Sequence, residues 1–457
     1  MRHAAGKAAP GAGAKGVDRQ VASTRCAVIT PYAGKRARGQ AERRTPEARL
    51  DEAVGLARAI DLDVVHQALM PIAEVKPSTY MGSGKVAEIA DIVAGEEIGL
   101  VFVDAALSPV QQRNLEKAWS TKVVDRTALI LEIFGQRART KEGALQVELA
   151  HLTYQRSRLV RSWTHLERQR GGFGFLGGPG ETQIEADRRL IGERIVRIEK
   201  DLEQVKRTRA LHRTSRKRVP YPVVALVGYT NAGKSTLFNR LTKAEVVAQD
   251  LLFATLDPTL RAVDLAHGTR IILSDTVGFI SELPTQLVAA FRATLEEVIE
   301  ADVVLHVRDM SHPDTDAQAE DVKDVLTDLG IDTTSGGRVV DVWNKIDAVS
   351  VEMRERIDNT VVRKDAETRP VPVSALTGEG TQALLDTVER RITAGRVRLE
   401  VSLAGEDGEG LGWLYRQGEV LERASDPDGS IRVILRLLPE RAPLVTRRFG
   451  PRRVKRL

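Results

Sequence analysis

The amino-acid sequence predicts a multidomain α/β protein, and three observations support this fold class. The 457 residues exceed what one hydrophobic core usually supports. Two stretches, near residues 25–138 and 219–397, alternate strand-like apolar runs with helix-like amphipathic runs, which is typical of parallel sheets covered by helices. Between them, residues 139–218 show the apolar spacing of an antiparallel helical hairpin.

The first alternating stretch predicts a small N-terminal α/β domain. Short apolar runs predict strands, and apolar residues at helical spacing predict helices between them. The expected strands cover 26–30, 64–72, 100–104 and 122–125, and the expected helices cover 46–60, 84–93 and 109–119. The loop Met81-Gly82-Ser83-Gly84-Lys85 lacks the full spacing of a phosphate loop, and we interpret it as a helix start.

The hairpin is predicted from two heptad series. Their apolar positions repeat with 4-3 spacing, so each series forms one apolar face that can pack against the other. The first series is Leu145, Leu149, Leu152, Leu159, Trp163 and Leu166, and the second is Ile191, Ile195, Ile198, Leu202 and Val205.

The expected tip of this hairpin is the glycine-rich segment 171–180, which carries three large apolar side chains and two flanking arginines: Phe173, Phe175, Leu176, Arg168 and Arg170. Aromatic rings stack on unpaired bases and arginines meet phosphates, so we expect the tip to dock on an RNA-containing partner. The alternative is that the apolar side chains fold back against the hairpin.

A phosphate-binding loop is predicted at Gly228-Tyr229-Thr230-Asn231-Ala232-Gly233-Lys234-Ser235, followed by Thr236. An apolar strand (223–227) precedes it and a helix follows it, which is the context that a GxxxxGK[ST] loop requires. The glycines let backbone N–H groups face phosphate oxygens, and Lys234 supplies a charge for the outer phosphates. Ser235 offers a hydroxyl to Mg²⁺.

Two switch segments are expected downstream of the loop. Asp275-Thr276-Val277-Gly278 ends a predicted strand (270–275), so that Asp275 can hold Mg²⁺ through water and the Gly278 N–H can reach the γ-phosphate. Phe253-Ala254-Thr255-Leu256-Asp257-Pro258-Thr259 lies where a switch loop would place a threonine hydroxyl on Mg²⁺, and we favour Thr255 over Thr259. Lys234, Thr255 and Gly278 are the expected catalytic set.

The base is predicted from Asn344-Lys345-Ile346-Asp347. One carboxylate can accept both the N1–H and the exocyclic amine of guanine, and adenine has no such donor pair, so Asp347 selects GTP. Asn344 and Lys345 brace the pocket, and Ser374-Ala375-Leu376 supplies a backbone N–H for the guanine oxygen. Further strands are expected at 303–309, 339–344 and 371–374, and the domain is predicted to be a GTPase.

The residue after Gly278 predicts slow hydrolysis. Many GTPases have a glutamine there to orient the attacking water, but this chain has Phe279. A phenyl ring makes no such hydrogen bond. We therefore expect an unassisted rate at or below about 10⁻³ s⁻¹, raised by a partner that reorders the switches.

The chain ends carry much of the positive charge. Residues 1–50 hold eleven Lys or Arg against three acidic residues, and a second basic cluster lies at 447–456. We expect 1–24 to be a disordered basic tail and 398–457 to be a small C-terminal α/β domain, with strands at 399–403 and 431–437 and a helix near 411–425. Localised basic segments indicate a polyanionic partner such as RNA, although such runs are more often solvated faces.

Composition places the chain among soluble globular proteins, with 42% hydrophobic and 29% charged residues. No apolar run reaches membrane-spanning length and no signal core is apparent, so we expect a cytoplasmic protein without membrane insertion, a monomer by default. The single cysteine, Cys26, cannot form an internal disulfide and is interpreted as a small strand residue.

The order of these segments resembles the HflX GTPases, and the resemblance covers nearly the whole chain after the N-terminal tail. It rests on long motifs: 77–85, 108–115, Gly178-Pro179-Gly180-Glu181-Thr182-Gln183, 228–235, 253–259 and 275–279. The resemblance implies a cytoplasmic, Mg²⁺-dependent GTPase that binds the large ribosomal subunit and its RNA, is stimulated by it, and separates stalled or idle ribosomes, often under stress. It also implies that the tip 171–180 points into the peptidyl transferase region.

Two other readings stay open from the residues alone. The chain could be a GTPase that regulates RNA modification or large-subunit assembly, with chemistry in the N-terminal domain. It could also be a scaffold with an inert nucleotide pocket, which the intact set of Lys234, Ser235, Thr255 and Asp275 disfavours. Nucleotide-dependent comigration with ribosomes would discriminate between them.

Overall fold

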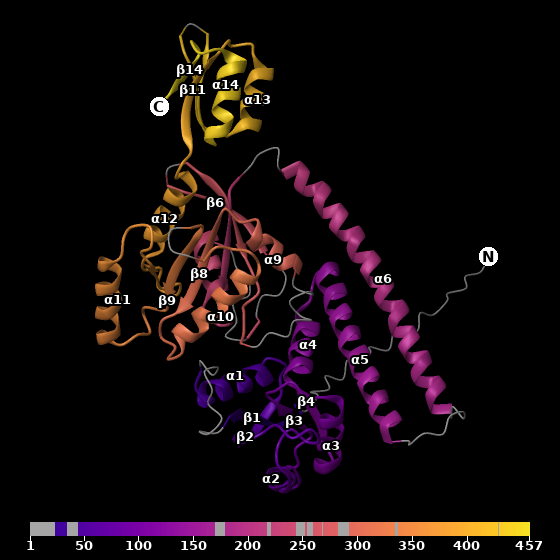
Figure 1. Ribbon diagram of the computed structural model, residues 1–457. Coiled ribbons are helices and arrows are strands. Elements are labelled where there is room, and N and C mark those ends of the chain that lie inside the picture. The colour runs from indigo at the N-terminus through magenta and orange to yellow at the C-terminus, as the bar shows by residue number, and fades with distance from the viewer. Residues whose placement is uncertain are drawn as a thin grey trace, which may run out of the picture.

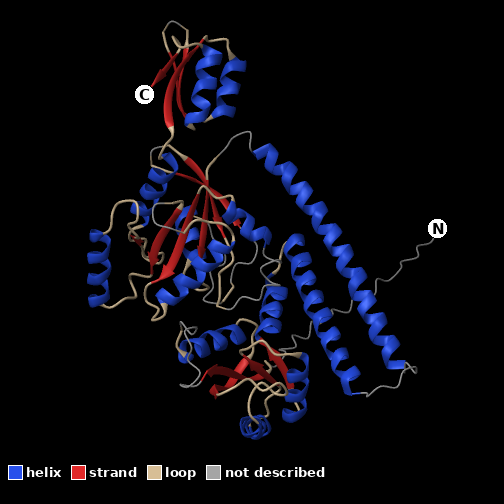
Figure 2. Ribbon diagram, viewed as in Figure 1, coloured by secondary structure: helices blue, strands red, loops and turns tan. Residues whose placement is uncertain are grey.

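The computed structural model describes residues 23–33, 44–169, 179–216, 221–243, 252–253, 259–266, 268–281, 292–333, 337–427 and 429–457. This part of the chain forms three β-sheets and a pair of long helices (Figures 1 and 2). The sheets follow one another along the chain, and the helix pair separates the first from the second. The predicted multidomain α/β architecture is therefore confirmed.

The N-terminal sheet is parallel, with strand order β2-β1-β3-β4. Its strands are β1 (Arg25–Ala33), β2 (Asp63–Ile72), β3 (Leu100–Val103) and β4 (Lys122–Asp125). The helices are α1 (Pro46–Arg58), α2 (Ser83–Gly95), α3 (Pro109–Trp119) and α4 (Arg126–Arg137). The glycine loop before α2 is a helix start, as predicted, with Gly82 at the N-cap. Cys26 is fully buried in β1, and burial raises the pKa of its thiol to about 12.

Helix α4 was not predicted from the sequence. It follows β4 without a connecting loop, and the Asp125 carboxylate caps it by accepting the Ala128 N–H at 2.8 Å. The hydrophobic side of α4 is almost wholly buried, with Leu129, Ile130 and Phe134 each at most 1% exposed. The apolar residues of α4 form one short run, 128–134, which periodicity alone does not distinguish from a buried strand.

The predicted hairpin is present as α5 (Lys141–Gln169) and α6 (Pro179–Arg216), which lie side by side along one flank of the molecule (Figure 1). In the second series Ile195, Ile198 and Leu202 are buried, as the 4-3 spacing requires. In the first series Leu145, Leu149 and Leu152 are only half-buried, whereas Val147 and Ala150 of α5 are buried. On the outer surface, Arg194 of α6 donates two hydrogen bonds to the Glu148 carboxylate of α5, from Nε at 2.7 Å and from Nη2 at 2.9 Å.

The central sheet has six strands in the order β10-β9-β8-β5-β7-β6, parallel except for β6. The strands are β5 (Val223–Gly228), β6 (Thr259–Asp264), β7 (Arg270–Asp275), β8 (Val303–Asp309), β9 (Val339–Asn344) and β10 (Val371–Pro372). The helices are α7 (Lys234–Thr242), α9 (Arg292–Ile299), α10 (Thr315–Asp328), α11 (Val351–Arg363) and α12 (Thr381–Thr393). The five predicted strands are confirmed, although β10 ends at Pro372 and not at Ser374. Strand β6 was missed, because its half-exposed edge position lacks a continuous apolar run.

The C-terminal sheet is antiparallel, in the order β12-β13-β11-β14. Its elements are β11 (Val397–Leu403), α13 (Gly408–Gln417), β12 (Glu419–Ser425), β13 (Ile431–Leu437), the 3₁₀ turn Pro439–Arg441, α14 (Ala442–Phe449) and β14 (Val454–Arg456). The prediction of one helix near 411–425 was wrong over its second half. The helix ends at Gln417. At the next residue, Gly418, an added Cβ would lie 2.6 Å from the Arg436 carbonyl oxygen, and the chain then pairs with β13.

Within the described residues, no helix is both long enough and apolar enough to cross a membrane. The predicted tail at 1–24 falls almost wholly outside the described part of the chain.

Candidate functional site

The loop between β5 and α7 has the backbone of a phosphate cradle. Gly228 has φ +152°, and a Cβ there would lie 2.2 Å from the Val307 carbonyl oxygen. Gly233 has φ +87°, and a Cβ there would lie 2.3 Å from Asn344 Nδ2. Only glycine fits these two positions, so the predicted spacing is a steric requirement of the turn. Asn231 at the loop apex also has positive φ, +60°, and is exposed.

Lys234 opens α7 and lies under the loop. Its ammonium donates to the carbonyl oxygens of Gly228 and Tyr229 at 3.1 and 2.8 Å. The side chain is almost wholly buried; this burial lowers the pKa of Lys234 to about 8, although the Asp275 carboxylate opposes the shift. The loop therefore holds a buried cation that an anion such as phosphate would stabilise.

Ser235 and Asp275 meet beside the loop. The Ser235 hydroxyl donates to Asp275 Oδ2 at 2.7 Å, from the start of α7 to the end of β7. Next to them, the Thr236 backbone continues α7, and the Thr276 hydroxyl donates to the Leu226 carbonyl oxygen at 2.5 Å. A hydroxyl and a carboxylate are hard oxygen donors, so the pair fits Mg²⁺.

The segment Val277-Gly278-Phe279 packs directly on the loop. The Phe279 N–H donates to the Gly228 oxygen at 3.0 Å, and the Thr230 N–H donates to the Phe279 oxygen at 2.7 Å. Gly278 lies so close that an added Cβ would be 2.8 Å from Thr230 Cα and 2.9 Å from Lys234 Nζ. The structure therefore brings Gly278 beside the lysine that the sequence assigned to the outer phosphates.

The predicted base-binding loops converge on Asn344 at the end of β9. Its Nδ2 donates to the Ala232 oxygen at 2.8 Å, and its Oδ1 accepts the Ala375 N–H at 3.0 Å. Ser374 is fully buried, whereas Asp347 is exposed and Leu376 is 70% exposed. Ile346 is buried, and the Lys345 ammonium pairs with Asp309 Oδ2 at 2.8 Å. The amide of Asn344 thus links the phosphate loop to the loop predicted to read the guanine oxygen.

Several predicted residues lie outside the described part of the chain: Ala254, Thr255, Leu256, Asp257, Arg170, Phe173, Phe175 and Leu176. Arg168 lies in α5, with only its backbone described. Phe253 is described, and its ring is buried against Phe134 of α4 in an edge-to-face contact with centroids 4.7 Å apart. Its side chain therefore contributes to packing against helix α4 of the N-terminal domain.

Residues from the helices of the N-terminal domain also reach the site, which sequence reasoning missed. Glu52 of α1 and Arg126 of α4 contact Tyr229 and Ser281, on either side of the Gly278 segment. Arg44 joins them from the segment before α1. Tyr229 and Glu52 are 177 positions apart, so no local spacing could have linked them.

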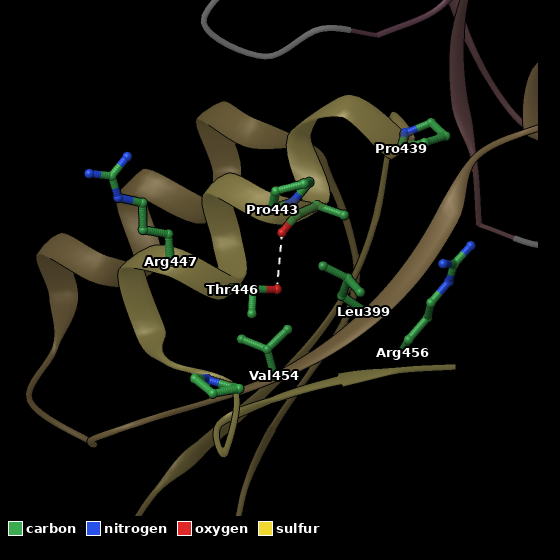
Figure 3. Close-up of a pocket in the computed structure, with 9 residues that line it drawn as sticks. Leu399, Pro439, Pro443, Thr446, Arg447, Val454 and Arg456 are labelled. Carbon is green, nitrogen blue, oxygen red and sulfur yellow. Dashed lines mark hydrogen bonds between the residues drawn. The ribbon is translucent and has the colours of Figure 1, made fainter.

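A separate hollow of about 630 Å³ lies in the C-terminal sheet region, between α14 and the strands β11 and β14 (Figure 3). Leu399, Pro443 and Val454 form an apolar lining, with Arg447 and Arg456 on opposite sides. This hollow contains none of the predicted site residues.

Four features of this site define a P-loop GTPase. They are a glycine cradle after a central parallel strand, a buried lysine, a serine–aspartate pair and an asparagine that joins the base loops. Four family models match the chain in order: "GTP-binding GTPase N-terminal" at 47–135, "GTP-binding GTPase Middle Region" at 137–216, "50S ribosome-binding GTPase" at 223–345 and "HflX C-terminal domain" at 359–456. The chain belongs to the HflX family of GTPases.

Curated relatives agree with this assignment. The chain is 53% identical to the GTPase HflX of Magnetococcus marinus over 88% of this chain and 89% of that protein. It is 46% identical to the GTPase HflX of Escherichia coli over 79% of this chain and 83% of that protein. Among solved structures, it is similar to a GTP-binding protein from Sulfolobus solfataricus in complex with GDP, with 23% identity and a TM-score of 0.41, over 81% of this chain and 99% of that chain.

Proposed function

We propose that the protein hydrolyses Mg²⁺-bound GTP at this site and uses the GTP cycle to split or rescue stalled or idle ribosomes through the large subunit. The family assignment supplies GTP hydrolysis and the class of 50S ribosome-binding GTPases. The finer statement, action on whole ribosomes, is the part proposed here. The units we assign are the N-terminal domain (25–138), the hairpin (139–218), the GTPase domain (219–397) and the C-terminal domain (398–457).

In this proposal the phosphate loop 228–235 wraps the phosphates and Asp347 accepts two hydrogen bonds from guanine. Ser235 and Thr255 would hold Mg²⁺ directly and Asp275 would hold it through water; the ion neutralises charge on the β- and γ-phosphates. The N–H of Gly278 would contact the γ-phosphate. Its place beside Lys234 supports this assignment.

The observation that carries the proposal is a continuous core between the switch segment and the root of the hairpin. Val277, Phe279 and Ile280 of the GTPase domain belong to the same buried cluster as Phe134 of α4 and Val147 of α5. Packed cores move between discrete arrangements and deform little in between, so a shift of the switch on GTP binding would be passed to the hairpin. A nucleotide-dependent conformational change that reaches the hairpin would allow the protein to separate the two ribosomal subunits.

The test is nucleotide-dependent binding and splitting of ribosomes on sucrose gradients. With a non-hydrolysable GTP analogue the protein should comigrate with the large subunit and convert whole ribosomes into subunits; with GDP it should do neither. A variant with Phe173, Phe175 and Leu176 replaced by serine should keep intrinsic hydrolysis but lose stimulation and splitting. The matched control replaces Val351 and Val362, two exposed apolar residues of α11, by serine.

Three results would contradict the proposal or one of its parts. Comigration independent of the nucleotide would leave no role for the GTP cycle in docking. Splitting that survives the tip substitutions intact, or falls equally in the α11 control, would reduce segment 171–180 to a linker. Binding only to immature large subunits, without splitting, would favour a role in assembly.

A further inference from the structure

A buried polar cluster joins the N-terminal domain to the nucleotide site, and we name it the Glu52 cluster: Arg44, Glu52, Arg126, Tyr229 and Ser281. The Glu52 carboxylate accepts hydrogen bonds from all four other members. Arg44 and Arg126 each donate to it at 2.5 Å, the Ser281 hydroxyl donates at 2.9 Å, and the Tyr229 hydroxyl donates as well. One carboxylate of α1 therefore holds a phosphate-loop residue and a residue of the switch segment at once.

The cluster has further bonds that close it. The Tyr229 hydroxyl oxygen accepts the Ser281 N–H at 2.7 Å and Arg44 Nη1 at 2.9 Å. Arg126 Nη2 donates to the Ser281 carbonyl oxygen at 2.8 Å, and its Nη1 donates to Asp104 at 2.5 Å. Both the backbone and the side chain of Ser281 are thus bonded to helices α1 and α4 of the N-terminal domain.

The arginines and Glu52 of the cluster are charged, and their side chains are almost wholly buried. The side chains of Arg44, Glu52 and Arg126 are 5–6% exposed. Burial alone would raise the pKa of Glu52, but the guanidinium groups of Arg126 and Arg44 outweigh burial and lower that pKa to about 2. Glu52 is therefore a pure acceptor at neutral pH. Buried charges of this kind are costly unless fully bonded, so the geometry is tightly specified.

The cluster brackets the reacting end of the nucleotide site. Tyr229 is the second residue of the phosphate loop, and Ser281 is three residues after Gly278. Between these two anchors, Phe279 exchanges backbone hydrogen bonds with Gly228 and Thr230. Tyr229 and Ser281 thus hold Gly278 against the loop. A Cβ added to Gly278 would lie 2.9 Å from Lys234 Nζ.

We infer that Glu52 is a positioning residue for GTP hydrolysis: by holding Tyr229 and Ser281 it keeps the Gly278 segment beside Lys234, ready for the γ-phosphate. This inference rests on the proposed nucleotide site and deepens it. When the donor is already in place, less of the free energy of binding the γ-phosphate is spent on ordering the switch segment. GDP lacks this phosphate, so its binding should depend much less on the position of the Gly278 segment.

The test uses the full chain and single-turnover GTP hydrolysis without ribosomes, beside the Kd for GDP. Ser281→Ala removes one hydroxyl that donates to the ionised Glu52 carboxylate and should lower the hydrolysis rate by about tenfold or more, the factor for one hydrogen bond to a charged group. The Kd for GDP should change less than about twofold, within the scatter of such contacts. Ser281→Thr keeps the hydroxyl and should restore the rate. Tyr229→Phe removes a hydroxyl that both donates and accepts, so its rate should fall further.

A matched control exists at Thr269, far from the loop. Its buried hydroxyl donates to Glu389 at 2.9 Å and accepts from Arg436, a similar hydroxyl–carboxylate–arginine group. Thr269→Val should lower thermal stability as the cluster variants do but leave the hydrolysis rate unchanged.

The outcomes separate the two hypotheses. An unchanged or faster rate in Ser281→Ala, or an equal loss in Thr269→Val, overturns the positioning role while the nucleotide site stands. A loss that Ser281→Thr does not restore also overturns it. If Lys234→Ala binds GDP as well as the unmodified chain, the proposed site itself fails.

Discussion

Asn344 donates its side-chain N–H to the Ala232 carbonyl oxygen at 2.8 Å, and this bond ties the end of β9 to the apex of the phosphate loop. The same amide accepts the Ala375 N–H at 3.0 Å. Asn344 is 1% exposed, and its contact with Gly233 leaves no room for a side chain there. The base pocket and the phosphate pocket are therefore one rigid unit at this point.

Asn344→Ala should weaken the binding of GDP and of GTP analogues together, by about tenfold to a hundredfold. Two buried groups, the Ala232 oxygen and the Ala375 N–H, would each lose a partner, and nucleotide binding would then have to order both loops, at a cost of about 1–3 kcal/mol in all. Titration with a fluorescent GDP analogue measures the effect, with the exposed Asn359→Ala of α11 as the control. Loss of affinity for only one of the two nucleotides would contradict the single-unit interpretation.

Asp347→Asn should change the base preference of the site from guanine to xanthine. The carboxylate accepts two N–H groups of guanine, whereas an amide N–H can meet the second oxygen of xanthine. Competition of GDP and XDP for the same fluorescent nucleotide reads out the exchange. Because Asp347 is exposed, the substitution should leave thermal stability near that of the unmodified chain. Unchanged GDP affinity in the variant would refute the assignment of Asp347.

Phe279→Gln should fail to accelerate hydrolysis, although it restores the residue that many GTPases use there. The Phe279 ring is 4% exposed in the core shared by the GTPase and N-terminal domains, so the new amide would be buried without a built partner. We expect the free energy of unfolding to fall by about 2–4 kcal/mol. Single-turnover hydrolysis and denaturant unfolding test this, with Phe279→Leu as the apolar control. A faster rate with unchanged stability would show that the side chain turns toward the nucleotide.

Sequence patterns predicted the elements with clear periodicity and the motifs whose geometry is local. The phosphate loop is such a case, because the positive φ of Gly228 and Gly233 is a property of the turn itself. The Glu52 cluster is the opposite case. Glu52 sits on a helix as an ordinary acidic residue, and only the docking of α1 against Tyr229 gives it a role. At Gly418, helix-like spacing continued across a boundary that contact with β13 sets.

The pKa of Lys234 predicts a pH dependence of nucleotide binding. In the nucleotide-free protein, burial lowers this pKa to about 8 from the ordinary value of 10.5. Bound phosphate favours the charged form and raises the pKa again, so binding between these two values takes up a proton. The Kd for GDP should therefore increase as pH rises above about 8, by at most about tenfold per pH unit. In the absence of nucleotide the free energy of unfolding should rise across the same window, because the unfolded chain keeps the proton that the folded chain releases.

Lys234→Arg separates this effect from the titration of the nucleotide itself, because arginine stays charged throughout. The affinity of this variant for GDP will be lower, because a guanidinium does not fit the place of an ammonium. The comparison therefore uses the slope of log Kd against pH and not Kd itself. Fluorescent GDP titrations from about pH 7 to about pH 9.5 should give a steeper increase of Kd in the unmodified chain than in the variant. Parallel slopes would mean that the Lys234 ammonium keeps its proton without the phosphate, and that the loop carbonyls of Gly228 and Tyr229 already compensate for its burial.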